Sequence, residues 1–410
     1  MAELRSRAHG EPWDLERRVE LDRGRARPKK VPFRLRKVRE HFVEGNRVTL
    51  LRNGAEAFPA MLGAIESAEQ EVLLEMYWFE SDTIGWRFVE ALSGAAGRGV
   101  RVAVLYDSLG SWATDAELFA SLVGAGVKLR EFNPLAPWKK RFRFDRLSRR
   151  SHRKILVVDS VVGFTGGLNI ADAWLPPEQG GQGWRDDMVK VEGAVVGELV
   201  ECFVAAWRSQ GGETLGRERR ARPTAIVGEQ RVRVLGQYPA RNRREIADAY
   251  LWHIYRARRR VWIASSYFLP DRSVVRALVR AARRGVDVRI IVPGVSDVEI
   301  VRLASRAMWG RLMRAGVRLY EWHLSTLHSK TAVIDSRWST VGTFNLDYRS
   351  LFMNWEVNVA VLDRGFAGAV EASFRRDVEL ANEVDYDDFH FRPLGERIIE
   401  RIGYWLRRFL

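Results

Sequence analysis

The chain has 410 residues, of which 46% are hydrophobic, so it is long enough for two domains with apolar cores and too apolar to be a disordered chain. It carries 67 Lys and Arg against 52 Asp and Glu, which gives a formal net charge of +15 and a pI near 10.2. This charge favours an anionic partner: a phospholipid surface, a nucleic acid or a phosphate ester. The one cysteine, Cys202, excludes an internal disulfide, and its apolar surroundings indicate a core position.

Residues 1–45 are polar, and we expect them to form a basic N-terminal arm. Between Arg25 and Arg39 they contain eight basic residues and no acid. This pattern leaves two interpretations open, a solvated tail and an anchor on an anionic surface. No apolar stretch near the N-terminus suits a signal peptide, and no charge-free apolar window reaches the roughly 18 residues of a membrane span. We therefore expect no transmembrane helix.

A first domain is expected over residues 46–210, and its elements alternate between strand and helix patterns. Residues 71–79 read as a buried strand, residues 84–99 as an amphipathic helix that ends in glycine, and residues 100–107 as the next strand. A strand, helix, strand order of this kind predicts a parallel sheet with crossover helices.

Residues 137–150 are an insertion that has no counterpart in the second half. Around it, residues 136–154 contain nine Lys or Arg beside a single Asp, with Trp138, Phe142 and Phe144 interleaved. A solvated loop would explain the charge. Because the insertion directly precedes a motif described next, we favour a lip on the substrate or membrane side, with basic residues for phosphate and aromatic residues for the interface.

The sequence of residues 151–169, SHRKILVVDSVVGFTGGLN, returns as LHSKTAVIDSRWSTVGTFN at 327–345. The shared residues lie 176 positions apart, with no gap inside either copy. A repeat that keeps His, Lys and Asn in register indicates a chemical site rather than a structural coincidence. The paired residues are His152, Lys154, Asp159, Gly166 and Asn169 in the first copy, and His328, Lys330, Asp335, Gly342 and Asn345 in the second.

Residues 211–230, rich in Gly and Arg, are the expected linker to a second domain over residues 231–385. This second domain repeats the pattern of the first, so the internal repeat is a whole domain. The matching segments are 71–79 with 260–268, 90–106 with 276–292, and 125–133 with 315–323.

Residues 386–410 form an amphipathic C-terminal tail in which a helix begins after Pro393. Docking of this helix on its own protein and docking on lipid both remain open, because arginines flank the apolar face and a Trp lies near the end. The apolar face consists of Leu394, Ile398, Ile399, Ile402, Trp405, Leu406 and Phe409.

The repeated motif suits transfer of a phosphoryl group. One histidine can attack phosphorus while the second protonates the leaving oxygen. Lys154 and Lys330 would bring positive charge to the phosphate oxygens, and Asn169 and Asn345 would add amide donors. In an extended strand, residues two positions apart point the same way, so each His and its Lys meet one ligand.

Two acids follow the motifs on alternating strand patterns, Asp186 after the first and Glu356 after the second. A carboxylate on one ring nitrogen of a histidine fixes the tautomer that leaves the other nitrogen free. We expect these two acids to do this, with Asp186 serving His152. Asp159 and Asp335 belong to the catalytic motif, but are better interpreted as structural caps than as groups that react.

The two motifs resemble the HKD motifs of the phospholipase D superfamily, and the resemblance covers nearly all of residues 46–385. Residues 46–58, 265–271 and 345–358 are similar to the bacterial cardiolipin synthase branch, in particular to members without N-terminal membrane spans. One departure is Thr343, where the family more often has Ser or Gly; its hydroxyl remains a possible phosphate donor.

The resemblance implies an α/β fold of two pseudo-twofold-related αβα sandwich domains. Their sheets would be mixed and mostly parallel, with one active site at the interface. It also implies a covalent phosphohistidine on His152, His328 as general acid and then base, and no metal or other cofactor. The near-symmetry of the motifs leaves the opposite assignment of the histidines open.

The implied reaction is transfer of a phosphatidyl group from one phosphatidylglycerol to another, which yields cardiolipin. The expected partner is an anionic phospholipid membrane containing phosphatidylglycerol and cardiolipin, with no nucleic acid, and the expected location is peripheral, on the cytoplasmic face of the bacterial cell membrane. The alternatives are hydrolysis of phospholipid by the same site, a metal-independent nuclease, and a non-catalytic membrane-binding protein. Intact motifs in both halves argue against the last.

Overall fold

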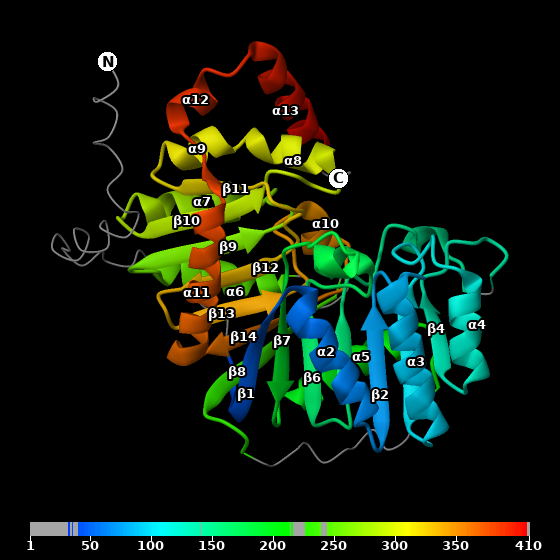
Figure 1. Cartoon of the computed structure of the whole chain (residues 1–410). Helices are drawn as coiled ribbons and strands as arrows, with labels where there is room; N and C mark the ends of the chain where they lie inside the picture. Colours follow the sequence, from blue (N-terminus) through cyan, green and yellow to red (C-terminus); the bar gives the residue numbers. More distant parts are fainter. Residues whose placement is uncertain are drawn as a thin grey trace.

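The strands of both halves join into one continuous sheet in the computed structural model (Figure 1). The structure describes residues 40–139, 141–213, 226–238 and 244–407, together with Pro32, Leu35 and Leu215. Most of the predicted N-terminal arm and the middle of the predicted linker lie outside these residues. Across the described residues the strand order is β15-β11-β10-β9-β12-β13-β14-β8-β1-β7-β6-β5-β2-β3-β4.

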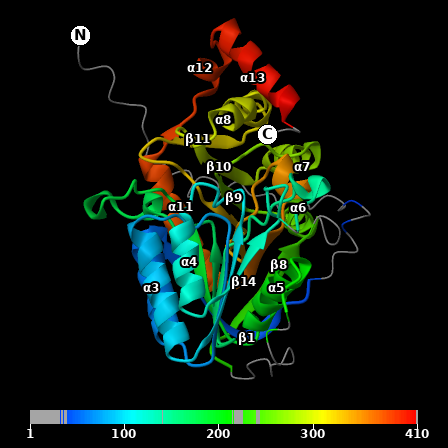
Figure 2. The ribbon, with the colours of Figure 1, turned by 90° about the vertical axis from the view of Figure 1, so that its right-hand side faces the viewer.

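The first half places helices on both faces of its part of the sheet. Side chains alternate along β2, so Val72 and Leu74 pack under α2, α3 and α4, whereas Leu73 faces the core that α5 covers. Figure 2 shows α3 and α4 on one side of the strands and α5 on the other. The elements are β1 (Val43–Arg52), α2 (Asn53–Glu66), β2 (Glu71–Met76), α3 (Thr83–Gly97), β3 (Arg101–Asp107), α4 (Ala116–Gly124), β4 (Lys128–Phe132), β5 (Ile155–Val158), β6 (Val162–Gly166), β7 (Asp187–Glu192) and α5 (Val196–Ser209).

The second half repeats this arrangement. Its order β8-β14-β13-β12-β9-β10-β11 matches β1-β7-β6-β5-β2-β3-β4, and β1 pairs with β8 at the seam. The elements are β8 (Gln230–Gln237), α6 (Glu245–Arg256), β9 (Arg260–Ser265), α7 (Arg272–Ala282), β10 (Asp287–Pro293), α8 (Glu299–Arg306), α9 (Trp309–Met313), β11 (Arg318–Trp322), β12 (Lys330–Ile334), β13 (Trp338–Gly342), α10 (Tyr348–Phe352), β14 (Glu356–Leu362), α11 (Arg364–Leu380), β15 (Asn382–Glu383), α12 (Tyr386–His390) and α13 (Leu394–Leu406).

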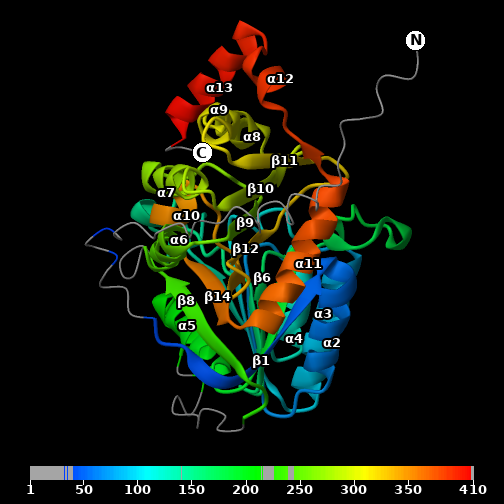
Figure 3. The ribbon, with the colours of Figure 1, turned by 90° about the vertical axis from the view of Figure 1, so that its left-hand side faces the viewer.

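Two helices share a core beneath the seam. The side chains of α5 and α11 pack with strand residues from both halves in one cluster that includes Val189, Val234 and Val359. Helix α11 also contacts β1 of the first half, as Figure 3 shows. The two αβα sandwiches that the sequence predicts are therefore present, with their sheets fused edge to edge.

The expectation of mostly parallel pairing is wrong. Within the described residues, the parallel neighbours are β2 with β3, β3 with β4, β9 with β10 and β10 with β11, and all other neighbours in the sheet run antiparallel. The reason lies in the motif strands. Each returns directly through a tight turn at Asp159-Ser160 or Asp335-Ser336, where φ is positive at both residues, so no crossover helix intervenes.

Candidate active site

The motif strands place each His and Lys together, as the sequence predicts. His152 lies just before β5, and His328 lies two residues before the first residue of β12. The Lys154 ammonium donates to the backbone oxygen of His152 at 2.8 Å, and Lys330 makes the equivalent bond to His328. All four side chains are buried, so their charges act in a medium that screens them weakly.

The two histidines meet the two predicted acids crosswise. His152 Nδ1 lies 3.2 Å from Glu356 Oε2 and 3.1 Å from the backbone oxygen of Thr343. His328 Nδ1 lies 2.7 Å from Asp186 Oδ2. The prediction that acids orient the histidines is thus matched by the geometry, but the prediction that Asp186 serves His152 is wrong: each half supplies the acid for the other half's histidine.

Backbone hydrogen bonds between the two halves explain why each histidine meets the acid of the other half. The His152 amide donates to the Trp355 oxygen at 3.0 Å, next to Glu356, and the His328 amide donates to the Arg185 oxygen at 2.8 Å, next to Asp186. The backbone just before β7, next to Asp186, is thereby joined to the second motif, and the backbone just before β14, next to Glu356, is joined to the first. The two histidines form one site because these hydrogen bonds join the motif of each half to the other half.

Glu356 is held as an anion. Burial alone would raise its pKa, but contacts with His152 and Thr343 outweigh burial and hold the pKa below its usual value. Its Oε1 also accepts from the Ser350 hydroxyl at 2.8 Å and from Asn354 Nδ2 at 3.3 Å. Because Nδ1 of His152 faces two acceptors, it carries the ring proton, and Nε2 keeps a free lone pair.

Asp186 accepts fewer hydrogen bonds than Glu356 does. It accepts from Trp174 Nε1 at 3.0 Å and from the Asp187 amide at 2.8 Å, and burial raises its pKa to about 7 against the opposing charge of Lys330. The Lys330 ammonium also lies 3.1 Å from His328 Nδ1. With pKa values of about 7 for Asp186 and about 8 for Lys330, both groups titrate near neutral pH, whereas Glu356 stays ionised.

Burial also shifts the bases of the site. It lowers the pKa of His152, helped by the charge of Lys154, and holds the pKa of His328 well below its ordinary value, helped by Lys330. The pKa of Lys154 is held well below normal by burial and by Lys330, and burial lowers the pKa of Lys330 to about 8. A neutral imidazole is the form that can attack an electrophile.

The two motif asparagines lie in matching positions at the ends of the central parallel strands. Asn169 Oδ1 accepts from the Trp78 amide at 3.1 Å, just after β2, and Asn345 Oδ1 accepts from the Ser266 hydroxyl at 2.7 Å, just after β9. With the amide oxygen engaged, the NH₂ group is the part of each side chain that is left for a ligand.

Thr343 does not fit the predicted role of phosphate donor. Its hydroxyl donates to Glu356 Oε2 at 2.5 Å and accepts from the Val357 amide at 3.0 Å, so it supports the carboxylate. In the first half the equivalent residue is Gly167, and the Asp186 carboxylate lies directly over it. Glu356 accepts from this hydroxyl and Asp186 has no counterpart at Gly167, which accounts for part of the difference in pKa between the two acids.

Asp159 and Asp335 lie at the far ends of the motif strands, seven residues from their histidines, or roughly 20 Å along extended chain. Asp159 accepts from the amides of residues 69–71, and Asp335 from those of residues 258–260. The structure thus gives them a capping contact, as their interpretation as structural caps anticipates, and leaves them out of the site.

Buried ion pairs behind the site escaped the sequence reasoning. Arg185 pairs with Asp187 and with Asp377 of α11, at 2.7 Å in both cases, and Arg153 pairs with Glu75 of β2 at 3.1 Å. The chain contains 67 Lys and Arg, so nothing in the sequence separates these two arginines from solvated ones. Their position next to Asp186 and His152 does not separate them either, because Glu75 and Asp377 lie far from them in the sequence.

Aromatic rings line both histidines. Tyr77 packs edge-on against His152 with ring centroids 5.1 Å apart, and Trp174 does the same against His328 at 5.3 Å. Tyr77 directly follows β2, and Trp174 is the last residue of a short 3-10 helix (Asp172–Trp174) of the first half, so the first half supplies the ring against His328 as well. These rings limit the rotation of the imidazoles.

The insertion at 137–150 presents aromatic side chains to solvent. Trp138 and Phe144 are 85% and 79% exposed, and Phe142 packs edge-on against Phe144. Its last residue, Arg150, is buried and lies 3.6 Å from Asp107 at the end of β3. The insertion is thus fixed where it joins the motif and open at its tip, which is compatible with the predicted lip.

The residues that the structure describes contain neither a group of side chains suited to a metal ion nor a membrane-spanning helix. No three His, Cys, Asp or Glu side chains within them are grouped so as to hold a metal ion. Likewise, none of the helices formed by these residues has the length and apolar character needed to cross a bilayer.

Comparison with known proteins places the chain among proteins with phospholipase D-like domains. A family model described as "Cardiolipin synthase, PLD-like domain" matches residues 61–176 and 250–378. A cardiolipin synthase of Geobacillus thermodenitrificans is 35% identical over 360 residues, which cover 87% of this chain and 71% of that protein. Cardiolipin synthase A of Pseudomonas putida is 36% identical over 368 residues, with 87% and 74% covered.

Among solved structures, phosphatidylserine synthase of Haemophilus influenzae has a similar fold. The TM-score is 0.69 at 14% sequence identity, and the match covers 88% of this chain and 95% of that one. The fused pair of domains therefore occurs in a protein with little sequence in common with this one. The matched family model and the two relatives show that the chain belongs to the cardiolipin synthase family, whose members contain phospholipase D-like domains.

Proposed function

We propose that the protein is a cardiolipin synthase that transfers a phosphatidyl group from one phosphatidylglycerol to another. The observation that carries this proposal is the crosswise pairing of His152 with Glu356 and of His328 with Asp186, which builds two oriented histidines into one buried site. The relatives in the family, named cardiolipin synthases, supply the substrate class.

In the first step, the Nε2 lone pair of His152 attacks the phosphorus of phosphatidylglycerol. The bond between phosphorus and the headgroup oxygen breaks, and His328 gives its proton to that oxygen, so glycerol leaves. A phosphatidyl group remains on His152. The ionised Glu356 stabilises the imidazole as it becomes cationic, which favours His152 as the nucleophile over His328.

In the second step, a hydroxyl of another phosphatidylglycerol gives its proton to His328. Its oxygen attacks phosphorus, the bond between phosphorus and nitrogen breaks, and cardiolipin forms with free His152. The Asp186 and His328 pair suits this alternation because Asp186, with a pKa of about 7, lies 2.7 Å from His328 Nδ1, so the pair can take up and release a proton near neutral pH.

The remaining motif residues hold the phosphate. Lys154 and Lys330 place two ammonium groups beside the histidines, and Asn169 and Asn345 each have an amide NH₂ for a non-bridging oxygen. These groups meet the charge that develops on the phosphate oxygens in both steps. We assign Thr343 to the support of Glu356 instead.

The +15 charge suits work at an anionic bilayer. We place the protein peripherally at the cytoplasmic face of the bacterial cell membrane, with phosphatidylglycerol and cardiolipin as its lipid partners.

The proposal is tested by incubating the purified protein with phosphatidylglycerol vesicles and identifying the products by mass spectrometry. We expect cardiolipin and glycerol from the wild type. His152→Gln and His328→Gln should each reduce cardiolipin formation by a factor of about 1,000 or more. Phosphatidic acid as the main product would show that the protein is a hydrolase, and normal cardiolipin synthesis by His152→Gln would exclude the mechanism.

A further inference from the structure

The C-terminal helix α13 turns its apolar face away from the protein. Its buried residues are a glutamate and a glycine, Glu400 and Gly403. The large apolar side chains on the opposite side are exposed: Leu394 71%, Ile398 57%, Ile399 56%, Ile402 54% and Trp405 76%. An amphipathic helix that packs on its own protein normally buries its apolar stripe, so this orientation is the reverse of the usual one.

Helix α13 is held on the protein by ion pairs and by a close helix-to-helix contact. Glu400 accepts from Arg306 of α8 and from Arg392, at 3.0 and 2.9 Å. Gly403 lies so close to α8 that an added Cβ would be 3.2 Å from the Ala304 Cβ. Figures 1, 2 and 3 all show α13 lying against α8 at the outer end of the second half. The outward orientation is therefore fixed by a matched contact.

We propose that the exposed face of α13 docks on a bilayer that contains anionic phospholipid. This inference rests on the proposed function in so far as the substrate is a lipid. Arg397 and Arg401 border one edge of the apolar face, where they reach the headgroups of a bilayer while Ile398 and Trp405 enter its interface. A second copy of the chain is a poorer occupant, because both partners would bring the same arginines and a net charge of +15.

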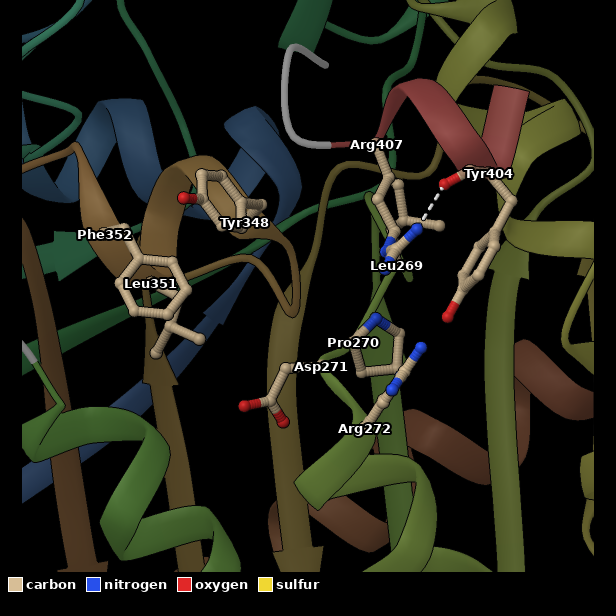
Figure 4. Close-up of a pocket in the computed structure, with 9 residues that line it drawn as sticks. All are labelled: Leu269, Pro270, Asp271, Arg272, Tyr348, Leu351, Phe352, Tyr404 and Arg407. Atoms are coloured by element: carbon tan, nitrogen blue, oxygen red, sulfur yellow. Dashed lines mark hydrogen bonds between the residues drawn. The ribbon is translucent and has the colours of Figure 1, made fainter. Parts of the chain in front are cut away.

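The end of α13 leads towards the active site. A pocket of about 490 Å³ lies between this end, the start of α7 and α10, and Figure 4 shows its lining. Helix α10 begins at Tyr348, three residues after Asn345. The pocket has an apolar wall formed by Leu269, Pro270, Leu351 and Phe352, and basic side chains from Arg272 and Arg407.

The pocket lining resembles the exposed face of α13, because both are apolar with arginines at the border. The one acid in it, Asp271, is already engaged, because it caps α7 and pairs with Arg244 at 3.3 Å. A bilayer held by α13 therefore meets a basic and apolar surface that extends towards the second motif.

The test is binding of the full chain to vesicles of phosphatidylcholine, with and without phosphatidylglycerol, measured by co-sedimentation. We expect the triple variant Ile398→Ser, Ile402→Ser, Trp405→Ser to bind mixed vesicles about tenfold more weakly than the wild type, or worse. The matched control is Val123→Ser, Val161→Ser, Leu380→Ser, whose residues are 54–55% exposed elsewhere on the protein, and it should bind as the wild type does.

A second variant, Arg397→Glu with Arg401→Glu, keeps the apolar face and should lose the preference for vesicles with phosphatidylglycerol. Equal binding by the wild type and the Ile398, Ile402, Trp405 variant would overturn the proposal. So would a loss of self-association, seen by analytical ultracentrifugation, in place of a loss of vesicle binding.

Turnover of short-chain phosphatidylglycerol in detergent separates this proposal from the proposed function. The α13 variant should retain wild-type turnover there, which also shows that it is folded. If the wild type made no cardiolipin in any lipid, the proposed function would fail, while the difference in vesicle binding would still decide the role of α13.

Discussion

Gly167 makes room for the acid that faces His328. A Cβ at this position would lie 2.1 Å from Asp186 Oδ1, closer than real Cβ atoms come to other heavy atoms. We therefore expect Gly167→Ala to push the carboxylate off His328 and to lower kcat about 100-fold, since small misplacements of catalytic groups have effects of this size. Steady-state kinetics would measure it. Gly63→Ala in α2, whose Cβ would meet nothing within 4 Å, is the control and should keep full activity.

We expect the titration of Lys330 to set an alkaline limit of activity. Burial lowers its pKa to about 8, so the free enzyme loses this ammonium as the pH rises through about 8. If the charge holds the phosphate, kcat/KM should fall further above that pH, in addition to any change caused by Asp186, which titrates at about 7. Lys330→Arg keeps a positive charge throughout this range, so its kcat/KM, although lower, should show no such fall. An unchanged alkaline limb in Lys330→Arg would assign the titration to another group.

At the scale of elements, the turns after β5 and β12 hold the motif strands in place. Asp335 has φ of 53° and accepts hydrogen bonds from the amides of Arg258, Arg259 and Arg260. Asp335→Ala removes the acceptor and leaves a Cβ in the left-handed region, so we expect the free energy of unfolding to fall by about 2–4 kcal/mol. Urea denaturation would measure this. Asp335→Asn, which keeps an acceptor and tolerates positive φ, should lose less than half as much.

These turns also mark the limit of prediction from sequence. The run of β-branched residues in ILVV and TAVI predicts strands, and both strands exist. The direction of the next strand depends on whether the chain turns back at once or crosses over, and that was decided by two residues with positive φ. The apolar face of α13 was also predicted, but its outward orientation depends on Glu400 and Gly403, whose partners on α8 are distant in the sequence.

At the scale of the whole molecule, the internal repeat was enough to predict one site from two motifs. The order of strands in each half is the same, as two copies of one domain require. The crosswise exchange of Asp186 and Glu356 could not be predicted, because it depends on which strands meet at the seam. The buried pairs of Arg185 with Asp187 and Asp377 were missed for the same reason.

The two halves are nonetheless chemically unequal. Glu356 has Thr343, Ser350 and Asn354 as donors and stays ionised, whereas Asp186 titrates near neutral pH. The molecule thus sets His152 beside an acid that stays ionised, and His328 beside an acid that titrates near neutral pH. This inequality is the reason why we propose His152, and not His328, as the residue that carries the covalent intermediate.

The most direct test is to map the covalent intermediate. The wild type and His328→Gln would be mixed with phosphatidylglycerol, denatured at alkaline pH within the first turnover, digested and examined by mass spectrometry. We predict a phosphatidyl group on the peptide that contains His152 in the wild type, much less of it in His328→Gln, which lacks the general acid, and none on the peptide that contains residue 328. A phosphatidyl group on His328 of the wild type, with His152 unmodified, would contradict the account.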